Sequence, residues 1–342
     1  MLSFVRATRP ALLLILISAL ALAGCESVFT PISPQAQSIA NLATILFVVA
    51  GLVFVVVEGT LLYFVLRFSR GRPAGETAEV ETKNERRIEI AWTAAPAVVL
   101  AIVFIVSMVI LRFLVTQPAA PGMGAAASAQ TLNVRVVAHQ WWWEFDYPDL
   151  GIVTANEMHA PVGATLLVSV ESADVIHSFW SPVLGGKIDA IPGQINRTIY
   201  TVTKVGDYGG QCSEFCGVDH AFMLFRVIVE PRAQFDSWVR QQQAPAATMT
   251  GHAASGEQMF MNGACIGCHT INGTIARGTL GPNLTHFASR GTFAGSTQQN
   301  TRDNIVKWLE DPQALKSGNL MPNLHLTPDQ IQALADYLES LR

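Results

Sequence analysis

Two long apolar stretches constrain this chain more than any other feature of its sequence. Residues 42–66 contain a single charged residue, Glu58, and residues 90–111 contain none. As a helix, the second stretch spans about 33 Å, enough to cross a bilayer core of about 30 Å. The sequence therefore predicts two transmembrane helices. Glu58 then either has a functional role or, as we favour, hydrogen-bonds to a partner helix near the end of its span.

The composition agrees with a membrane protein that also carries folded modules outside the bilayer. Of the 342 residues, 50% are hydrophobic and only 14% are charged, and the mean hydropathy is +0.33. These values argue against a simple soluble enzyme. The net charge of −4 lacks the basic excess of a nucleic-acid-binding protein. Two soluble modules of modest size are expected beside the two spans.

The first residues predict how the chain reaches the membrane. Residues 1–24 combine two arginines, an apolar stretch and a small-residue end, as a secretory signal peptide does. The sequence Leu-Ala-Gly before Cys25 resembles a bacterial lipoprotein processing site, so we expect Cys25 to be a lipid anchor; the alternative is an ordinary signal peptide. Six lysine and arginine residues within 67–89 predict a cytoplasmic loop between the spans. The membrane segment 25–116 thus leaves the following domains outside.

Residues 130–232 form the first external domain. They contain β-branched, partly alternating runs at 132–138, 165–170, 198–202 and 224–229, separated by Gly, Pro and Asp clusters. This pattern predicts a small antiparallel β-sandwich. The domain is acidic, with 11 Asp and Glu residues against 6 Lys and Arg residues, and it therefore favours cationic partners.

The loop of residues 211–223, QCSEFCGVDHAFM, is here called the copper loop. It gathers four donor side chains: Cys212, Cys216, His220 and Met223. Thiolate, imidazole and thioether together select copper in electron-transfer sites, whereas zinc rarely uses methionine. Two cysteines allow both sulfurs to bridge two metal ions, and each ion then needs its own imidazole. His177, at the end of an apolar strand, is the candidate for the second imidazole.

A disulfide between the two cysteines and a zinc site are the alternatives. A disulfide is possible outside the cytoplasm, but it would leave His220 and Met223 without a role. His139 and His159 lie in the same domain without a thiol neighbour, so we expect both to be structural.

These residues resemble subunit 2 of cytochrome c oxidase, in the haem-copper oxidase superfamily. The resemblance covers residues 39–232, including the two spans, the segment HQWWW at 139–143, the segment GGKIDAIPG at 185–193 and the copper loop. It implies a cupredoxin sandwich with a binuclear copper A centre. It also implies six ligands: Cys212 and Cys216 as bridges, His177 and His220 as terminal ligands, Met223 as a weak ligand, and Glu214 through its backbone carbonyl.

The resemblance implies further roles outside the copper ligands. The side chain of Glu214 would also bind magnesium at the interface with subunit 1. Trp141 matches the tryptophan at which electrons enter, and Glu89 matches the glutamate at the mouth of a proton-uptake path into subunit 1. Two positions depart from the family pattern, since many relatives have Tyr in place of Trp142 and often Asn in place of Asp219. Neither departure removes a ligand.

The end of the chain predicts a second metal site. After a polar linker at residues 240–255, a C-x-x-C-H motif at Cys265, Cys268 and His269 is the signature of covalent haem c, in which two thiols bind the haem and the histidine binds iron. Residues 256–342 resemble an all-α class I cytochrome c. This module is nearly neutral, and a tether of about 15 residues gives an effective concentration in the millimolar range, so we expect charge steering to be dispensable.

The sixth iron ligand is expected to be Met321, in a loop rigidified by the proline that follows it. Met259 and Met261 lie only a few residues before the haem motif, and we expect them to pack in the first helix. The competing candidates are three histidines: His252, His286 and His325.

The predicted fold class is a two-helix transmembrane hairpin, an all-β cupredoxin sandwich and an all-α cytochrome c. The resemblance implies a subunit that passes electrons from cytochrome c, including its own haem c, through copper A to the haem of subunit 1. There the proton-translocating oxidase reduces oxygen to water. The alternatives are the corresponding subunit of a nitric oxide reductase and a copper-binding lipoprotein. Expected partners are subunit 1, subunit 3, a cytochrome c or other periplasmic donor and the bacterial inner membrane, with both metal domains on the periplasmic side.

Overall fold

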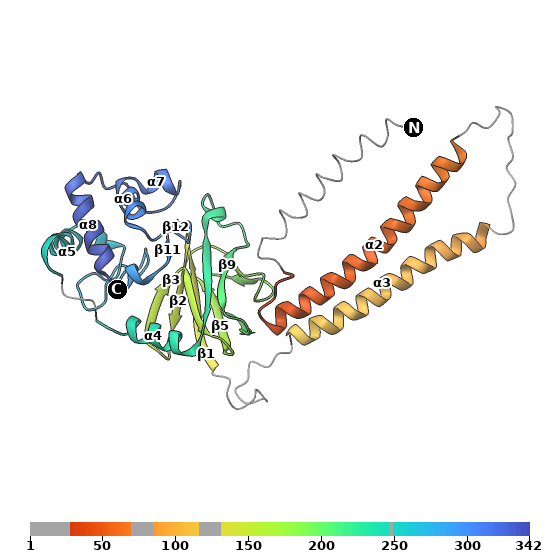
Figure 1. Cartoon of the computed structure of the whole chain (residues 1–342), viewed down its shortest axis with the longest axis horizontal. Helices are drawn as coiled ribbons and strands as arrows, with labels where there is room; N and C mark the ends of the chain where they lie inside the picture. The colour runs from red at the N-terminus through yellow and green to blue at the C-terminus, as the bar shows by residue number, and fades with distance from the viewer. Residues whose placement is uncertain (1–27, 70–84, 116–130, 246–248) are drawn as a thin grey trace. The chain divides into compact units, whose positions relative to one another are not determined.

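The computed structural model describes residues 28–69, 85–115, 131–245 and 249–342 (Figure 1). The chain divides into two compact units, one of residues 37–118 and the other of the remaining residues. The expected signal peptide, Cys25 and most of the expected cytoplasmic loop lie outside the described residues.

Two helices contain the predicted membrane spans: α2 (Pro34–Phe68) and α3 (Glu85–Val115). Both are long and apolar enough to cross a bilayer, and almost all of their apolar side chains are exposed. Apolar surface of this extent, exposed along most of two helices, is typical of segments that contact lipid rather than water. The prediction of two apolar spanning helices is therefore confirmed.

Two five-stranded sheets form the sandwich domain, residues 131–230. The first sheet has the order β3-β2-β1-β5-β8, with β1 (Thr131–His139), β2 (Trp142–Tyr147), β3 (Ile152–Ala155), β5 (Thr165–Ser172) and β8 (Asn196–Thr201). The second has the order β4-β10-β9-β6-β7, with β4 (Glu157–Pro161), β6 (His177–Trp180), β7 (Ile188–Ala190), β9 (Gly206–Cys212) and β10 (Leu224–Glu230).

Both sheets are mixed, so the prediction that the sandwich is antiparallel was wrong. β1 runs parallel to β5, and β4 runs parallel to β10. The alternation of apolar residues determines which face of a strand is buried, but this alternation is the same for both pairing directions. The direction depends on the connection instead, and the three strands between β1 and β5 form a crossover long enough for parallel neighbours.

The interior of the sandwich is aromatic. Alternate residues of β2, namely Trp143, Phe145 and Tyr147, are fully buried, because successive side chains of a strand point to opposite faces. Phe179 of β6 and Phe225 of β10 stack on each other with ring centroids 4.4 Å apart. This core fixes β6 and β10, which begin beside the copper loop.

The helical domain, residues 249–342, completes the described chain. Its elements are α5 (Gly251–Asn262), β11 (Thr292–Phe293), β12 (Gln298–Gln299), α6 (Arg302–Glu310), α7 (Pro312–Leu315) and α8 (Pro328–Ser340). The start of α8 is fixed by a capping box between Thr327 and Gln330, which satisfies backbone groups that a helix end leaves unpaired.

The linker is shorter than the sequence predicted. The helix α4 (Arg232–Gln242) extends into the expected linker of residues 240–255, and α5 already begins at Gly251. Phe235 and Trp238 of α4 belong to the core of the sandwich domain. The apolar side chains of α4 thus anchor this helix to the sandwich domain, including residues 240–242, which composition alone assigned to the linker.

Gly256 allows α5 and α8 to cross closely, and this contact gives a first prediction. A Cβ atom at Gly256 would lie 2.0 Å from the carbonyl oxygen of Ala333, and backbone cannot move aside cheaply. Gly256→Ala should therefore lower the free energy of unfolding of the helical domain by about 1–3 kcal/mol, which shifts its melting temperature by about 4–8 °C per kcal/mol. Calorimetry measures the shift, and Ser255→Ala, at an exposed position of α5, should leave it nearly unchanged. Equal melting temperatures in the two variants would contradict the prediction.

Candidate metal centres

The copper loop leaves the sheet at the end of β9 and returns to it at the start of β10. Cys212 is the last residue of β9, and Phe179 of β6 lies opposite it in the antiparallel pairing. His177 lies two residues before Phe179 on the same strand, so both side chains point to the same face. The register of β6 and β9 therefore brings His177 to the loop, although 35 residues separate it from Cys212.

Five of the expected side chains gather around two sulfur atoms. The Sγ atoms of Cys212 and Cys216 are 3.8 Å apart. His177 Nδ1 lies 3.8 Å from Cys212 Sγ, and His220 Nδ1 lies 3.5 Å from Cys216 Sγ. The Sδ atom of Met223 lies 3.9 Å from Cys216 Sγ. The structure thus brings together every side chain that the sequence proposed as a copper ligand.

The chemistry of this donor set fits copper. Both cysteines are free thiols, and their separation is well beyond the S–S bond length of about 2.05 Å. The neighbouring Cys216 thiol and the His177 ring lower the pKa of Cys212, which favours the thiolate, the form that binds metal. Buried sulfur and imidazole donors with a thioether at the side suit copper better than zinc.

The remaining expected residues lie at the loop or in α3. The backbone carbonyl of Glu214 lies 3.2 Å from Cys212 Sγ, and its exposed carboxylate lies 3.2 Å from Lys187 Nζ. Trp141 is 8% exposed, and its Nε1 donates to the carbonyl of Cys216 over 3.0 Å. Glu89 is exposed on α3, in the other unit of the chain.

Asp174 is a residue of this site that the sequence analysis missed. Its carboxylate lies 2.7 Å from Nε2 of His177, which fixes the ring with Nδ1 toward the cysteines. Burial opposes protonation of the ring, but the hydrogen bond to Asp174 and the contact with Cys212 raise the pKa of His177. A carboxylate three residues before a histidine is too common a pattern to have indicated this role.

Asp174→Ala should weaken copper binding, which is our second prediction. Partners that hold the second nitrogen of a metal-binding histidine contribute about 10–100-fold to metal affinity. The affinity can be measured by competition with a chelator in the purified complex. The control is Asp236→Asn, since Asp236 pairs with Arg232 on α4. Equal retention of copper in both variants would show that Asp174 does not support His177.

His139 and His159, the two histidines that we expected to be structural, make packing or hydrogen-bond contacts within the sandwich domain. His139 stacks on Trp142 with ring centroids 4.2 Å apart, and burial lowers the pKa of His139 to about 4. Nδ1 of His159 lies 2.9 Å from the carboxylate of Glu230. The His139 ring therefore serves packing in the sandwich domain, and the His159 ring serves hydrogen bonding.

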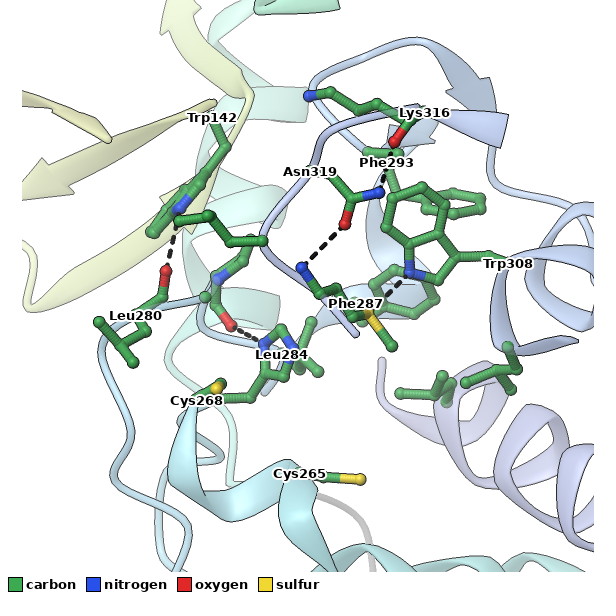
Figure 2. A pocket seen from close by; sticks show the side chains of 18 of the residues that line it. Trp142, Cys265, Cys268, Leu280, Leu284, Phe287, Phe293, Trp308, Lys316 and Asn319 are labelled. Carbon is green, nitrogen blue, oxygen red and sulfur yellow. Dashed lines mark hydrogen bonds between the residues drawn. The ribbon is translucent and has the colours of Figure 1, made fainter. Parts of the chain in front are cut away.

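The second candidate centre is an apolar cavity of about 290 Å³ around the C-x-x-C-H motif (Figure 2). Cys265, Cys268 and His269 line it. Apolar side chains of α5, α6 and α8 also line it: Phe260, Ile305, Leu309, Leu334 and Leu338. An apolar cavity with two thiols and an imidazole at its wall suits a haem that is attached through its vinyl groups.

The ring of His269 is oriented for a metal. Its Nδ1 donates to the carbonyl of Pro282 over 2.9 Å, which leaves Nε2 for iron. Burial lowers the pKa of His269 and so favours the neutral imidazole that binds metal. A Cβ atom at Gly281 would lie 2.5 Å from this ring, so a residue larger than glycine would displace the histidine.

Met321 lines the same cavity, as expected of a sixth ligand. Trp308 Nε1 donates to the Sδ atom of Met321 over 3.1 Å, which holds the thioether in place. The three competing histidines are all described, and none of them is among the lining residues. His252 contacts Asp336, and His325 is exposed.

Arg290 is a second residue that the sequence analysis missed. It lines the cavity and is 8% exposed, and its Nε has no hydrogen-bond partner among the described residues. Burial lowers the pKa of Arg290 to about 10, so the guanidinium group is still charged at neutral pH. An anionic group of a haem would satisfy this donor, and the cavity therefore fits the cofactor that the motif implies.

Four residues of the sandwich domain also line this cavity: Gln140, Trp141, Trp142 and Asn156. Trp142 Nε1 donates to the carbonyl of Leu280, in the helical domain, over 3.3 Å (Figure 2). Since Trp141 also donates to the carbonyl of Cys216, the two candidate centres share a wall at Trp141, and Trp142 lies beside it at the cavity. The sequence placed both residues in one motif but could not place them against the second domain.

The fold and the two sites define a membrane-anchored electron-transfer protein with one copper-type and one haem-type centre. Cytochrome c oxidase subunit 2 of Alkalihalophilus pseudofirmus is 34% identical over 315 residues, which are 91% of this chain and 90% of that protein. The subunit 2 of Bacillus subtilis is 32% identical over 348 residues, 97% of each chain. The chain belongs to the cytochrome c oxidase subunit 2 family, in the form with a fused cytochrome c domain.

Family profiles agree domain by domain. The profile "Cytochrome C oxidase subunit II, transmembrane domain" matches residues 29–110, the profile "Cytochrome C oxidase subunit II, periplasmic domain" matches 150–230, and "Cytochrome c" matches 253–342. The crystal structure of the periplasmic domain of cytochrome oxidase subunit II from Bradyrhizobium japonicum is 38% identical, with a TM-score of 0.33, and covers 35% of this chain and 97% of its own. The chain is thus a membrane-bound oxidase component whose domains imply copper A and haem.

Proposed function

We propose that this chain is the subunit through which electrons enter a terminal oxidase. With both metals bound, the two sites would supply one-electron transfer from a cytochrome c, through covalent haem c and copper A, to the haem of subunit 1, where O₂ is reduced. The observation that carries the proposal is the shared wall, since Trp141 and Trp142 line the haem-type cavity and Trp141 donates to Cys216.

The proposed ligands come from residues already placed at the two centres. At the copper centre they are bridging Cys212 and Cys216, terminal His177 and His220, Met223, and the carbonyl of Glu214. At the haem they are Cys265 and Cys268 for attachment, with His269 and Met321 for iron. The chain's own contribution is rigidity, because strands packed on an aromatic core hold the copper loop. Buried, fixed ligands rearrange little when charge changes, which keeps electron transfer fast at a small driving force.

Several finer roles belong to the same proposal. Cys25 carries the lipid anchor, the metal domains lie on the periplasmic side of the inner membrane, and Glu89 stands at a proton-uptake path into subunit 1. The exposed carboxylate of Glu214 takes a magnesium ion at the subunit 1 interface, where the cation would replace Lys187 as its partner. Subunit 3 and a cytochrome c complete the set of partners.

Two other functions make different predictions. A copper-storing lipoprotein would have exchangeable copper and no use for the cavity around His269. A nitric oxide reductase would use the same centres, and only its catalytic subunit would differ.

The test is purification of the native complex followed by metal analysis and gas uptake. We expect two copper ions and one covalent haem for each copy of this chain, and consumption of O₂ with reduced cytochrome c. Consumption of nitric oxide without O₂, or copper that exchanges freely with a chelator, would contradict the proposal.

A further inference from the structure

Three buried charged side chains lie where the sandwich domain meets the helical domain. Lys316 of the helical domain is 4% exposed, and Asp219 of the sandwich domain is fully buried. Glu157 of the sandwich domain is 2% exposed. Charges are costly to remove from water unless partners receive them. Their burial here indicates a built interface rather than a passing contact between two tethered domains.

The ammonium group of Lys316 contacts two segments of the sandwich domain. Its Nζ donates to the backbone carbonyl of Trp141 over 2.8 Å and lies 3.5 Å from the carboxylate of Asp219. Trp141 in turn donates to Cys216, and Asp219 immediately precedes His220. One side chain of the helical domain, Lys316, therefore contacts both Trp141 and the copper loop.

A second set of contacts fixes the orientation of the helical domain. The buried carboxylate of Glu157 accepts hydrogen bonds from the backbone N–H of Gly291 and of Thr292, and from the Thr292 hydroxyl, over 2.8–3.2 Å. The N–H of Leu224, which immediately follows the copper loop, donates to the carbonyl of Gly295 over 3.0 Å. Three backbone N–H groups thus find their partners only across the interface.

Gly295 lies at the centre of this contact. Its φ of +70° favours glycine, and a Cβ atom there would lie 2.6 Å from the carbonyl oxygen of Phe222 and 2.7 Å from Lys316 Nζ. The backbone of the helical domain therefore approaches the copper loop as closely as the absence of a side chain allows. A helical domain that repeatedly dissociates from the sandwich domain and binds again would not need such close packing between the two backbones.

We propose that Lys316 is the positioning residue of a permanent interface that keeps the helical domain docked on the copper loop. The consequence for electron transfer rests on the proposed function, but the contacts do not. Electron transfer between the two centres then needs no prior docking of the helical domain. A specific charge pair, rather than effective concentration alone, sets the geometry between the two centres.

Hydrogen exchange of backbone amides in the purified, metal-loaded oxidase tests the docking directly. The reporters are the amides of Leu224, Gly291 and Thr292, and the amides of β5 report on the fold of the sandwich domain. In the native complex, we expect the reporter amides to be protected. Exchange as fast as that of exposed loop amides would overturn the proposal.

Variants then test the role of Lys316. Lys316→Met leaves Asp219 buried and unpaired, so the reporter amides should exchange at least about tenfold faster while β5 is unchanged. Lys307→Met, at an exposed lysine of α6, is the matched control and should exchange like the native protein. Unchanged protection in Lys316→Met would overturn the proposal. If the β5 amides also exchange faster in Lys316→Met, Asp219→Asn takes the place of that variant. In Asp219→Asn we expect faster exchange of the reporter amides alone. Unchanged exchange of the reporter amides would overturn the proposal.

The double variant Asp219→Asn with Lys316→Met separates the charge pair from general packing. It buries no lone charge, so it should recover part of the lost protection. Exchange faster than in Lys316→Met alone would contradict the pairing. The proposed function fails separately, because a complex without copper or haem could still show protected amides.

The rate of electron transfer from haem c to copper A, followed after photoreduction of the haem, gives a readout that loss of stability alone would not move. A docked domain predicts a rate independent of solvent viscosity in the native complex. In Lys316→Met the rate should fall and become dependent on viscosity, because re-docking then limits it. A native rate that decreases as viscosity rises would overturn the proposal.

Discussion

Cys216→Ser should abolish the two-copper centre and leave the haem c absorbance intact. Cys216 Sγ is the atom around which the site is arranged, since it lies within 3.9 Å of Cys212 Sγ, His220 Nδ1 and Met223 Sδ. A serine hydroxyl at this position is a hard donor that stays protonated at neutral pH, so it cannot replace a thiolate as a bridge between two soft metal ions. We expect loss of the mixed-valence electron paramagnetic resonance signal and of oxidase turnover.

The matched control for this variant is Ser213→Ala in the same loop. The Ser213 hydroxyl has no hydrogen-bond partner among the described residues, so its removal should leave the copper signal unchanged. The copper-to-haem ratio of the purified complex completes the measurement, because the variant should retain all of its haem while losing copper. A two-copper signal that survives in Cys216→Ser would reject the assignment of the bridging ligands.

The copper ligands could be predicted because most of them lie within one short segment. The soft donors of residues 211–223 are adjacent in sequence, so their types alone indicate the metal. His177 was proposed for a different reason, as a histidine at the end of an apolar strand, but it is in fact the first residue of β6. The register of β6 and β9 explains why this inference works.

The contacts between the domains could not be predicted in the same way. Lys316 and Asp219 lie in different domains, and nothing near either residue indicates the other. Local patterns determine which face of an element is buried, but they do not determine which element covers it. The same limit explains why the sheets were expected to be antiparallel. It also explains why Arg290, an isolated arginine between two loops, gave no sign of lying in the haem cavity.

Met321→Ala should lower the reduction potential of haem c by a substantial part of the ~0.8 V range that axial ligands set. A thioether opposite an imidazole raises the potential of haem iron, and the small alanine side chain leaves that position to water. Redox titration of the complex measures the change, and the absorbance spectrum should report a changed ligand. Electron flow to oxygen should slow accordingly, since the haem becomes too strong a reductant for its donor to reduce.

Two further variants test whether Met321 itself, rather than another side chain, is the sixth iron ligand. Met321→His should preserve a six-coordinate spectrum while lowering the potential, because imidazole replaces the thioether without opening the position. Met259→Leu, on α5 and 37% exposed, should change neither property if that methionine is not a ligand.

An unchanged potential in Met321→Ala would move the assignment to a competing side chain. His286 is then the strongest candidate, because it is buried and both of its ring nitrogens lack partners among the described residues. It is not among the cavity-lining residues, however, so iron binding would require the segment around Phe287 to rearrange. Met321 needs no such movement, since it already lines the cavity and Trp308 holds its sulfur. The assignment therefore rests on a ligand that is in place before the haem binds.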